Sequence, residues 1–201
     1  MSDTALIDIF AEDHAHEAFL RAIVKRLARE KQKPLRTPRI RNARGGHGRV
    51  LAELKLYQKS VLKQISHSDE LPDLLIVAID ANCQRFAKAR QEIAKAVEPQ
   101  FTDRTVIACP DPHIEKWYLA DSISFHQVVG RQPRPIKKKC GRDRYKSLLA
   151  ETIRAASYPP ILGGIEFAED LVDAMDFYRA GKNDRSLQAF VDELSRQITL
   201  L

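Results

Sequence analysis

Acidic and amide side chains follow three apolar stretches of this sequence, and they are the residues best suited to carry chemistry. Glu12 follows the first stretch, Asp80 and Asn82 follow the second, and Asp111 and Glu115 follow the third. Their carboxylate and amide oxygens are hard ligands of the kind that a magnesium ion needs. Because like charges gathered without a cation would repel one another, this pattern predicts a divalent metal ion that binds phosphate and activates water.

The apolar stretches are predicted to be strands of one parallel sheet. The clearest is Leu74–Ile79, a run of six apolar residues that ends at Asp80 and is typical of a strand buried on both faces. Weaker strand signals lie at residues 5–10, 35–40 and 105–109. Ligand sites in such sheets lie just beyond the carboxyl ends of the strands, so we expect the acids to share one edge.

Helical patterns alternate with these strands. Apolar side chains recur at helical spacing over residues 14–30, 48–65, 84–97, 113–121 and much of 165–198. Asp13 and Asp111 are predicted to cap the helices that follow them, with Pro112 in the first turn of the later one. The alternation predicts an α/β fold, with a Rossmann-like, mostly parallel sheet flanked by helices and a helical C-terminal extension.

Length and composition favour one globular unit. The 201 residues are 44% hydrophobic and 30% charged, which suits a single α/β domain with a substantial core. We expect residues 1–130 to form the α/β core and residues 131–201 to form a basic loop and helical extension packed on it. No apolar run approaches the roughly 20 residues of a membrane span, and the N-terminus lacks the basic region typical of a signal peptide. The oligomeric state stays open.

The cysteines and histidines are assigned minor roles. Three widely spaced cysteines argue against a disulfide framework or a zinc cluster and favour a reducing cytoplasm. Cys109 and Trp117 are expected in the core. His14, His16 and His113 lie close in sequence to the candidate acids. Surface positions are the default for them, and His14 or His113 could alternatively shuttle protons.

Two basic segments account for the net charge of +6 and suggest a phosphate-rich partner. Residues 31–49 contain seven cations and no acid, and residues 131–144 contain seven more. Both could be plain solvated loops. Because each is expected to lie next to the proposed acidic edge of the sheet, we expect nucleic-acid phosphates to contact Arg41, Arg44, Lys137, Lys138 and Lys139.

Five short motifs resemble, in order, those of a known family. Phe10-Ala11-Glu12 and the helix start after it look like the first motif of Toprim domains, and Asp80-Ala81-Asn82 looks like their Asp-x-Asp motif. The stretch 112–121 is similar to the Glu-x-Trp-x-Leu-Ala-Asp signature of a bacterial Toprim-like family, whose genes often neighbour an ABC-type ATPase gene. Arg44-Gly45-Gly46 and the stretch 163–166 also resemble that family.

The resemblance implies a magnesium-dependent enzyme. Toprim folds occur in topoisomerases, primases and nucleases, and they hold the ion with a first Glu and a pair of Asp residues. By position, Glu12 and Asp80 are two of these ligands, and Asn82 stands where the second Asp usually stands. Glu115 or Asp111 would then compensate for the missing charge, or a single metal ion would be bound.

The implied function is that of a Mg²⁺- or Mn²⁺-dependent endonuclease with Glu12, Asp80 and Glu115 as catalytic residues. Its substrate would be DNA or RNA, including transfer RNA, and it would act in phage defence under the control of an ABC-type ATPase. Two alternatives stay open. The chain could be a non-catalytic regulator or sensor bound to the ATPase, with Asn82 marking lost chemistry, or a hydrolase of a small phosphorylated molecule.

Overall fold

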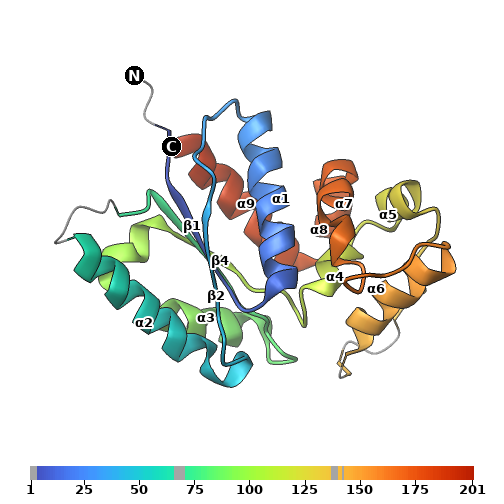
Figure 1. Cartoon of the computed structure of the whole chain (residues 1–201), viewed down its shortest axis with the longest axis horizontal. Coiled ribbons are helices and arrows are strands. Elements are labelled where there is room, and N and C mark those ends of the chain that lie inside the picture. Colours follow the sequence, from blue (N-terminus) through green and yellow to red (C-terminus); the bar gives the residue numbers. More distant parts are fainter. Residues whose placement is uncertain (1–3, 66–70, 137–139, 142) are drawn as a thin grey trace.

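One parallel sheet between two layers of helices forms the centre of the molecule (Figure 1). The computed structural model describes residues 4–65, 71–136, 140–141 and 143–201. The strands are β1 (Ile7–Ala11), β2 (Arg39–Asn42), β3 (Leu74–Ala78) and β4 (Thr105–Ala108). They lie in the order β2-β1-β3-β4, and every pair is parallel. The predicted α/β class with a parallel sheet flanked by helices is confirmed.

Side chains on successive strand residues alternate between two separate cores. On one face, Ile9 and Ile76 pack with α1 (His14–Glu30) and α9 (Arg185–Leu200). On the other face, Phe10 and Val77 pack with α2 (His47–Ile65) and α3 (Phe86–Ala96). All five residues of β3 are buried, as its apolar run predicts. With both faces covered, ligands must approach this sheet at its edges or at the ends of its strands.

The helix α1 has the bounds that its sequence predicts. The Asp13 carboxylate caps it by accepting hydrogen bonds from the N–H groups of Ala15 and His16, at 2.9 and 3.1 Å. Phe19 and Ile23 are fully buried on the face toward the sheet. Because the cap follows β1 directly, it fixes the backbone of residues 12–16 at the strand end.

Helices make up most of the chain after β4. The remaining helices are the 3-10 helix η1 (Pro99–Arg104) before β4 and, after it, α4 (Glu115–Tyr118), α5 (Ser122–Val129), α6 (Arg144–Ala155), the 3-10 helix η2 (Ile165–Phe167), α7 (Ala168–Ala174) and α8 (Phe177–Asn183). The predicted helical C-terminal part is confirmed. None of the helices in the described part of the chain has the length and apolarity that crossing a membrane needs.

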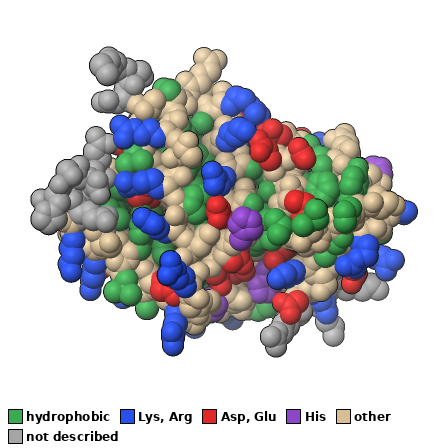
Figure 2. Space-filling model, viewed as in Figure 1, with side chains coloured by type: hydrophobic (Ala, Val, Ile, Leu, Met, Phe, Trp, Pro, Cys, Tyr) green, Lys and Arg blue, Asp and Glu red, His purple; other side chains and the backbone are tan. Residues whose placement is uncertain are grey.

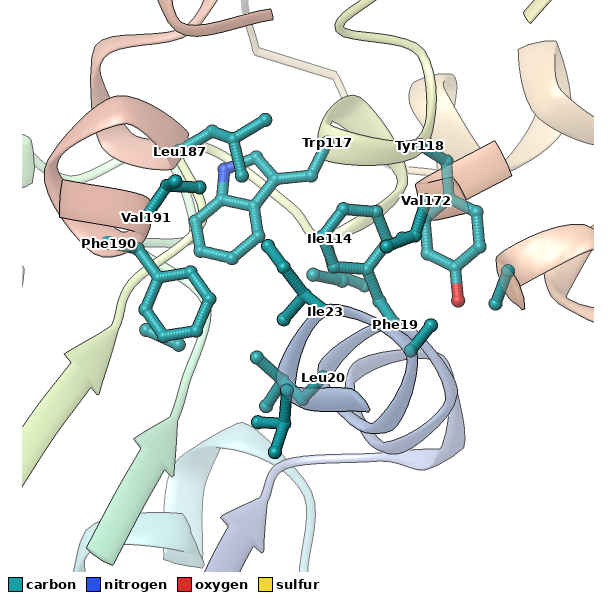
Figure 3. Close-up of a cluster of buried hydrophobic side chains, with 14 of the residues drawn as sticks. Phe19, Leu20, Ile23, Ile114, Trp117, Tyr118, Val172, Leu187, Phe190 and Val191 are labelled. Atoms are coloured by element: carbon teal, nitrogen blue, oxygen red, sulfur yellow. The ribbon is translucent and has the colours of Figure 1, made fainter. Parts of the chain in front are cut away.

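Aromatic side chains join this C-terminal part to the first helix (Figure 3). The Trp117 ring of α4 stacks on Phe190 of α9, with 5.3 Å between ring centroids, and lies 5.9 Å from Phe19 of α1. Trp117 is fully buried, as expected from the sequence. One core therefore runs from α1 through α4 to α9 and holds α4 beside the end of the sheet.

Residues 113–121 differ from the single helix predicted for them. The helix α4 is one turn long, begins at Glu115 and has no side-chain cap. The N–H of Asn82 donates to the carbonyl of Pro112 at 3.1 Å, so the chain before α4 is held against the turn after β3. Pro112 therefore lies outside the helix, and the predicted capping role of Asp111 is wrong.

Two of the three cysteines are paired. Cys83, in the turn after β3, forms a disulfide with Cys140, and their Cα atoms are 5.7 Å apart. The sequence-based argument against disulfide pairing is wrong, because the loop before α6 returns to the end of β3 and spacing along the chain does not reveal such a contact. Cys109 is free and buried, and burial raises the pKa of its thiol to about 12, as suits an inert core position.

Candidate metal centre

The carboxyl ends of β1 and β3 meet in the middle of the sheet edge. Since β2 lies outside β1 and β4 lies outside β3, the order of the strands reverses between these two neighbours. Open parallel sheets bind their ligands at such switch points. Glu12 follows β1, Asp80 follows β3, and the N–H of Asp80 donates to Oε2 of Glu12 at 2.9 Å. Two predicted metal ligands therefore converge across neighbouring strands.

A histidine in the first turn of α1 joins these two acids. The His16 side chain is fully buried, and its Nε2 lies 2.9 Å from Oδ1 of Asp80. Its Nδ1 lies 2.8 Å from Oδ1 of Asp13, the cap of α1. Glu12, His16 and Asp80 offer ligand atoms that all lie within 4.8 Å of one another. We call these three residues the candidate centre.

Hydrogen bonds and ion pairs balance the charges at the candidate centre. Burial raises the pKa of Glu12, and the nearby charge of Asp80 adds to this effect. Burial disfavours charge on His16, but the carboxylates of Asp80 and Asp13 outweigh burial and raise the pKa of His16 well above its ordinary value. At Asp13, the hydrogen bond from His16 outweighs burial and lowers the pKa to about 2. Protonated His16 thus bridges two carboxylates.

A cleft of about 440 Å³ opens beside the candidate centre, and its lining includes Asp80, His113, Glu115 and Lys146. Nδ1 of His113 lies 3.1 Å from Oδ2 of Asp80, and this hydrogen bond raises the pKa of His113. Burial raises the pKa of Glu115. The exposed Lys146 comes from α6. The structure therefore places Glu115 in the same cleft as Asp80, although outside the group of three.

Asn82 is connected to the candidate centre through a histidine. Its φ of 47° is a left-handed conformation that Asn tolerates better than most residues. Nδ2 of Asn82 lies 2.8 Å from Nδ1 of His47, the first residue of α2. This His47 nitrogen lies 3.4 Å from Oε1 of Glu12. Asn82 therefore lines the cleft and contacts His47.

The predicted ligand Asp111 is turned toward the C-terminal helices. Its N–H donates to Oγ of Ser186 in α9 at 3.2 Å, and its carbonyl accepts from Nζ of Lys116 at 3.0 Å. Asp111 does not line the cleft, and it does not belong to the group of three. The neighbours of Asp111 stay at the sheet edge, because the carbonyls of Pro110 and Pro112 accept hydrogen bonds from the turn after β3.

A basic groove of about 710 Å³ lies between β2 and α2, lined among others by Arg39, Arg41 and Arg44. Asp8 holds Arg39 through two contacts of 2.5 and 2.8 Å, whereas Arg41 and Arg44 form no ion pair with another residue in the described ranges. Figure 2 shows Lys and Arg side chains over this part of the molecule, with acidic and histidine side chains next to them. The predicted contacts Lys137, Lys138 and Lys139 lie outside the described residues.

Sequence reasoning gave no role in this site to His16, His47 or Lys146, and the surface position expected for His16 is wrong, because its side chain is fully buried. His16 and His47 contact residues 64 and 35 positions away in the sequence, so local patterns cannot reveal their partners. One signal was available for His16, because a side chain in the first turn of a helix points back toward the preceding strand end. Lys146 gave no signal, since only tertiary packing brings α6 to the cleft.

Comparisons with known proteins identify no relative of this chain. No family model, no curated protein and no solved structure matches it. Any function assigned to the protein must therefore be argued from its own residues.

Proposed function

We propose that the protein is a divalent-metal-dependent phosphodiesterase that cuts nucleic acid, as a Toprim-type nuclease would. The observation that carries the proposal is the convergence of Glu12, His16 and Asp80 at the switch point of a parallel sheet. Two largely buried carboxylates this close together favour a cation between them. The Toprim-like order of the sequence motifs supports the same activity.

The donor set fits the ion that the resemblance implies. The carboxylate oxygens of Glu12 and Asp80 are ligands that Mg²⁺ and Mn²⁺ accept, and Glu115 lies in the same cleft, where it can add a third carboxylate. When bound, such an ion polarises phosphoryl oxygens and lowers the pKa of a bound water. The hydrogen bond from His113 holds the Asp80 carboxylate in place for this role.

Cations on two sides of the candidate centre support a polyanionic substrate. Arg41 and Arg44 line the groove on the β2 side, and Lys146 lines the cleft on the α6 side. Arg and Lys side chains bind backbone phosphates independently of base sequence. A nucleic-acid strand lying across the sheet edge would contact both sides, with its scissile phosphate at Asp80. A small phosphate ester would reach only one side, which makes nucleic acid the favoured substrate class.

The cellular role follows from the resemblance alone. We propose that the enzyme is the effector of a phage-defence system and acts beside an ABC-type ATPase on DNA, RNA or transfer RNA. The rival role is that of a non-catalytic regulator or sensor, in which the same edge of the sheet binds the ATPase. Detection of cleavage separates the two roles.

The test is a cleavage screen with plasmid DNA, single-stranded DNA, single-stranded RNA, transfer RNA and bis(p-nitrophenyl) phosphate, each with Mg²⁺ and with Mn²⁺. We expect cleavage of at least one nucleic acid, loss of cleavage on chelation, and loss in Glu12→Gln and Asp80→Asn. The matched control is Asp103→Asn, which removes an exposed carboxylate of η1 before the amino end of β4 and should retain activity. The absence of cleavage under every condition would support the regulator.

A further inference from the structure

We infer that His16 is a direct ligand of the metal ion, with Asp13 as its outer partner, so that the centre selects a transition-metal ion such as Mn²⁺ over Mg²⁺. The inference rests on the metal centre of the proposed function and goes beyond it in naming a nitrogen ligand and the class of ion. The Toprim-like motifs of the sequence supply carboxylates only, so the histidine is a property of this chain.

The two ring nitrogens of His16 have different partners, and this difference carries the inference. Nδ1 lies 2.8 Å from Oδ1 of Asp13, and Nε2 points to the other side of the ring, 2.9 Å from Oδ1 of Asp80. In protein metal sites, a ligating histidine almost always donates its second ring N–H to a carboxylate or carbonyl, which fixes the tautomer and the ring orientation. Asp13 supplies that carboxylate here.

Asp13, the outer partner of His16, is held in place by its hydrogen bonds to the first turn of α1. Oδ1 of Asp13 also accepts the N–H groups of Ala15 and His16, at 2.9 and 3.1 Å, as the cap of α1. The His16 ring is fully buried, so packing and the Asp13 hydrogen bond together keep Nε2 directed at the carboxylates. A ligand nitrogen oriented in this way loses little conformational freedom when it binds an ion.

The number of charges also favours an ion over a simple salt bridge. The carboxyl groups of three acids, Asp13, Asp80 and Glu12, lie around the single His16 ring. His113 and His47, both partly exposed, contact Asp80 and Glu12 at 3.1 and 3.4 Å. A divalent ion between Glu12 and Asp80 would replace the proton on Nε2 and leave the Asp13 hydrogen bond intact.

A histidine ligand changes which ion the centre prefers. Mg²⁺ favours six oxygen ligands in an octahedral arrangement. Imidazole nitrogen is a better ligand for transition-metal ions, whose affinities follow the Irving–Williams order. Of these ions we choose Mn²⁺ as the probe, because it accepts carboxylate and imidazole ligands together and has a paramagnetic signal. The wild-type chain should therefore bind Mn²⁺ at least about tenfold more tightly than Mg²⁺.

The experiment is pulsed electron paramagnetic resonance of the full chain with Mn²⁺. We expect a ¹⁴N coupling from a histidine nitrogen in the wild type, replaced by a ¹⁵N coupling when the protein is made with ¹⁵N-labelled histidine. His16→Gln should lose the coupling and bind Mn²⁺ at least about tenfold more weakly, with little change for Mg²⁺. Asp13→Asn should keep the coupling but weaken Mn²⁺ binding by roughly 10–100-fold.

Three other histidine variants serve as matched controls. His14→Gln removes an exposed ring from the same turn of α1, where it contacts Glu17, and should change nothing. His113→Gln removes the other ring that contacts Asp80 and should keep the coupling.

The third variant, His47→Gln, removes the ring next to Glu12 and should also keep the coupling. Because these substitutions and the isotope exchange leave His16 in place, the test does not depend on whether His16→Gln folds.

Three outcomes would overturn the inference, and they differ in whether they also contradict the proposed function. A coupling that disappears in His113→Gln or in His47→Gln would assign the nitrogen ligand to that histidine. Saturable Mn²⁺ binding without any nitrogen coupling would show a centre of carboxylates alone, and the proposed function would stand. No saturable binding of Mn²⁺ or Mg²⁺ would overturn both the inference and the proposed function.

Discussion

Asp80 contacts three other residues of the site, His16, His113 and Glu12. Its two oxygens accept hydrogen bonds from His16 and His113, and its backbone N–H binds the Glu12 carboxylate. Only 8% of the residue is exposed. Asp80 is therefore both the proposed metal ligand and the acceptor on which the buried His16 depends.

Substitutions at Asp80 should separate these two roles. Asp80→Ala leaves the buried His16 without one of its acceptors and should lower the free energy of unfolding by about 1–3 kcal/mol. Asp80→Asn keeps an oxygen for His16 and should cost less than Asp80→Ala. Urea denaturation measures both, with Asp103→Ala as the exposed control. Equal stability of Asp80→Ala and wild type would contradict the structural role.

The sequence predicted the acids of the site better than its histidines. Glu12 and Asp80 could be predicted because each follows an apolar strand, and parallel strands end at one edge. His16 and His47 could not, because their contacts depend on which strand lies next to which. Asp111 was predicted at the centre by the same strand-end rule, which fails because Asp111 contacts α9 instead.

At the scale of elements, predictions held where the determinants are local. The bounds of α1 follow from its cap, Asp13, and from one apolar stripe, both of which lie within the helix or beside it. The segment 113–121 was predicted poorly because bonds from the turn after β3 hold its first residues outside α4. The strand β2 begins at Arg39, later than its sequence suggests, and Leu35 forms only an isolated bridge to Ala5.

The strand β2 and the residues directly after it supply the proposed phosphate-binding cations, Arg41 and Arg44. Replacing Arg41 and Arg44 with alanine should weaken binding of DNA similarly for all sequences, because phosphate contacts carry no base information. The slope of log affinity against log salt should fall by about one unit for each lost contact. Fluorescence anisotropy over a salt series with a DNA duplex measures both effects.

The control for this prediction removes two positive charges from the neighbouring helix α2. Lys55 and Lys59 are exposed on α2 and do not line the groove. The double variant Lys55→Ala with Lys59→Ala should keep most of the wild-type salt slope. If both double variants flatten the slope equally, binding depends on net charge and the groove has no special part in it.

At the scale of the whole molecule, a buried carboxylate links the helices of the C-terminal part. Asp121 is 3% exposed and accepts hydrogen bonds from Oγ of Ser124 at 2.7 Å and from Nη2 of Arg179 at 2.9 Å. It also accepts the N–H of Asp176 at 2.9 Å, which ties α5 to the start of α8. Although burial opposes it, these bonds lower the pKa of Asp121 to about 2.

The free energy of unfolding at acidic pH should depend on the hydrogen bonds of Asp121. The folded pKa of about 2 lies below the ordinary value of 3.8, so Asp121 stabilises the fold fully above pH 3.8 and loses this contribution as the pH falls toward 2. The contribution is roughly 2 kcal/mol. Asp121→Asn should lower the free energy of unfolding at pH 7 and flatten its decline between pH 4 and pH 2.

Urea denaturation at several pH values gives these free energies. Asp170→Asn, which changes an exposed carboxylate of α7, should follow the wild-type pH dependence. A pH dependence of Asp121→Asn parallel to that of the wild type would mean that Asp121 has no lowered pKa in the folded protein.

The account as a whole depends on a metal ion at the end of β1 and β3. Isothermal titration of Mn²⁺ into the full chain tests this most directly, with the double variant Glu12→Gln, Asp80→Asn beside the wild type. We predict saturable binding to the wild type that the double variant weakens by at least about a hundredfold, while circular dichroism shows both chains folded. Equal Mn²⁺ affinity in the two chains would contradict the account.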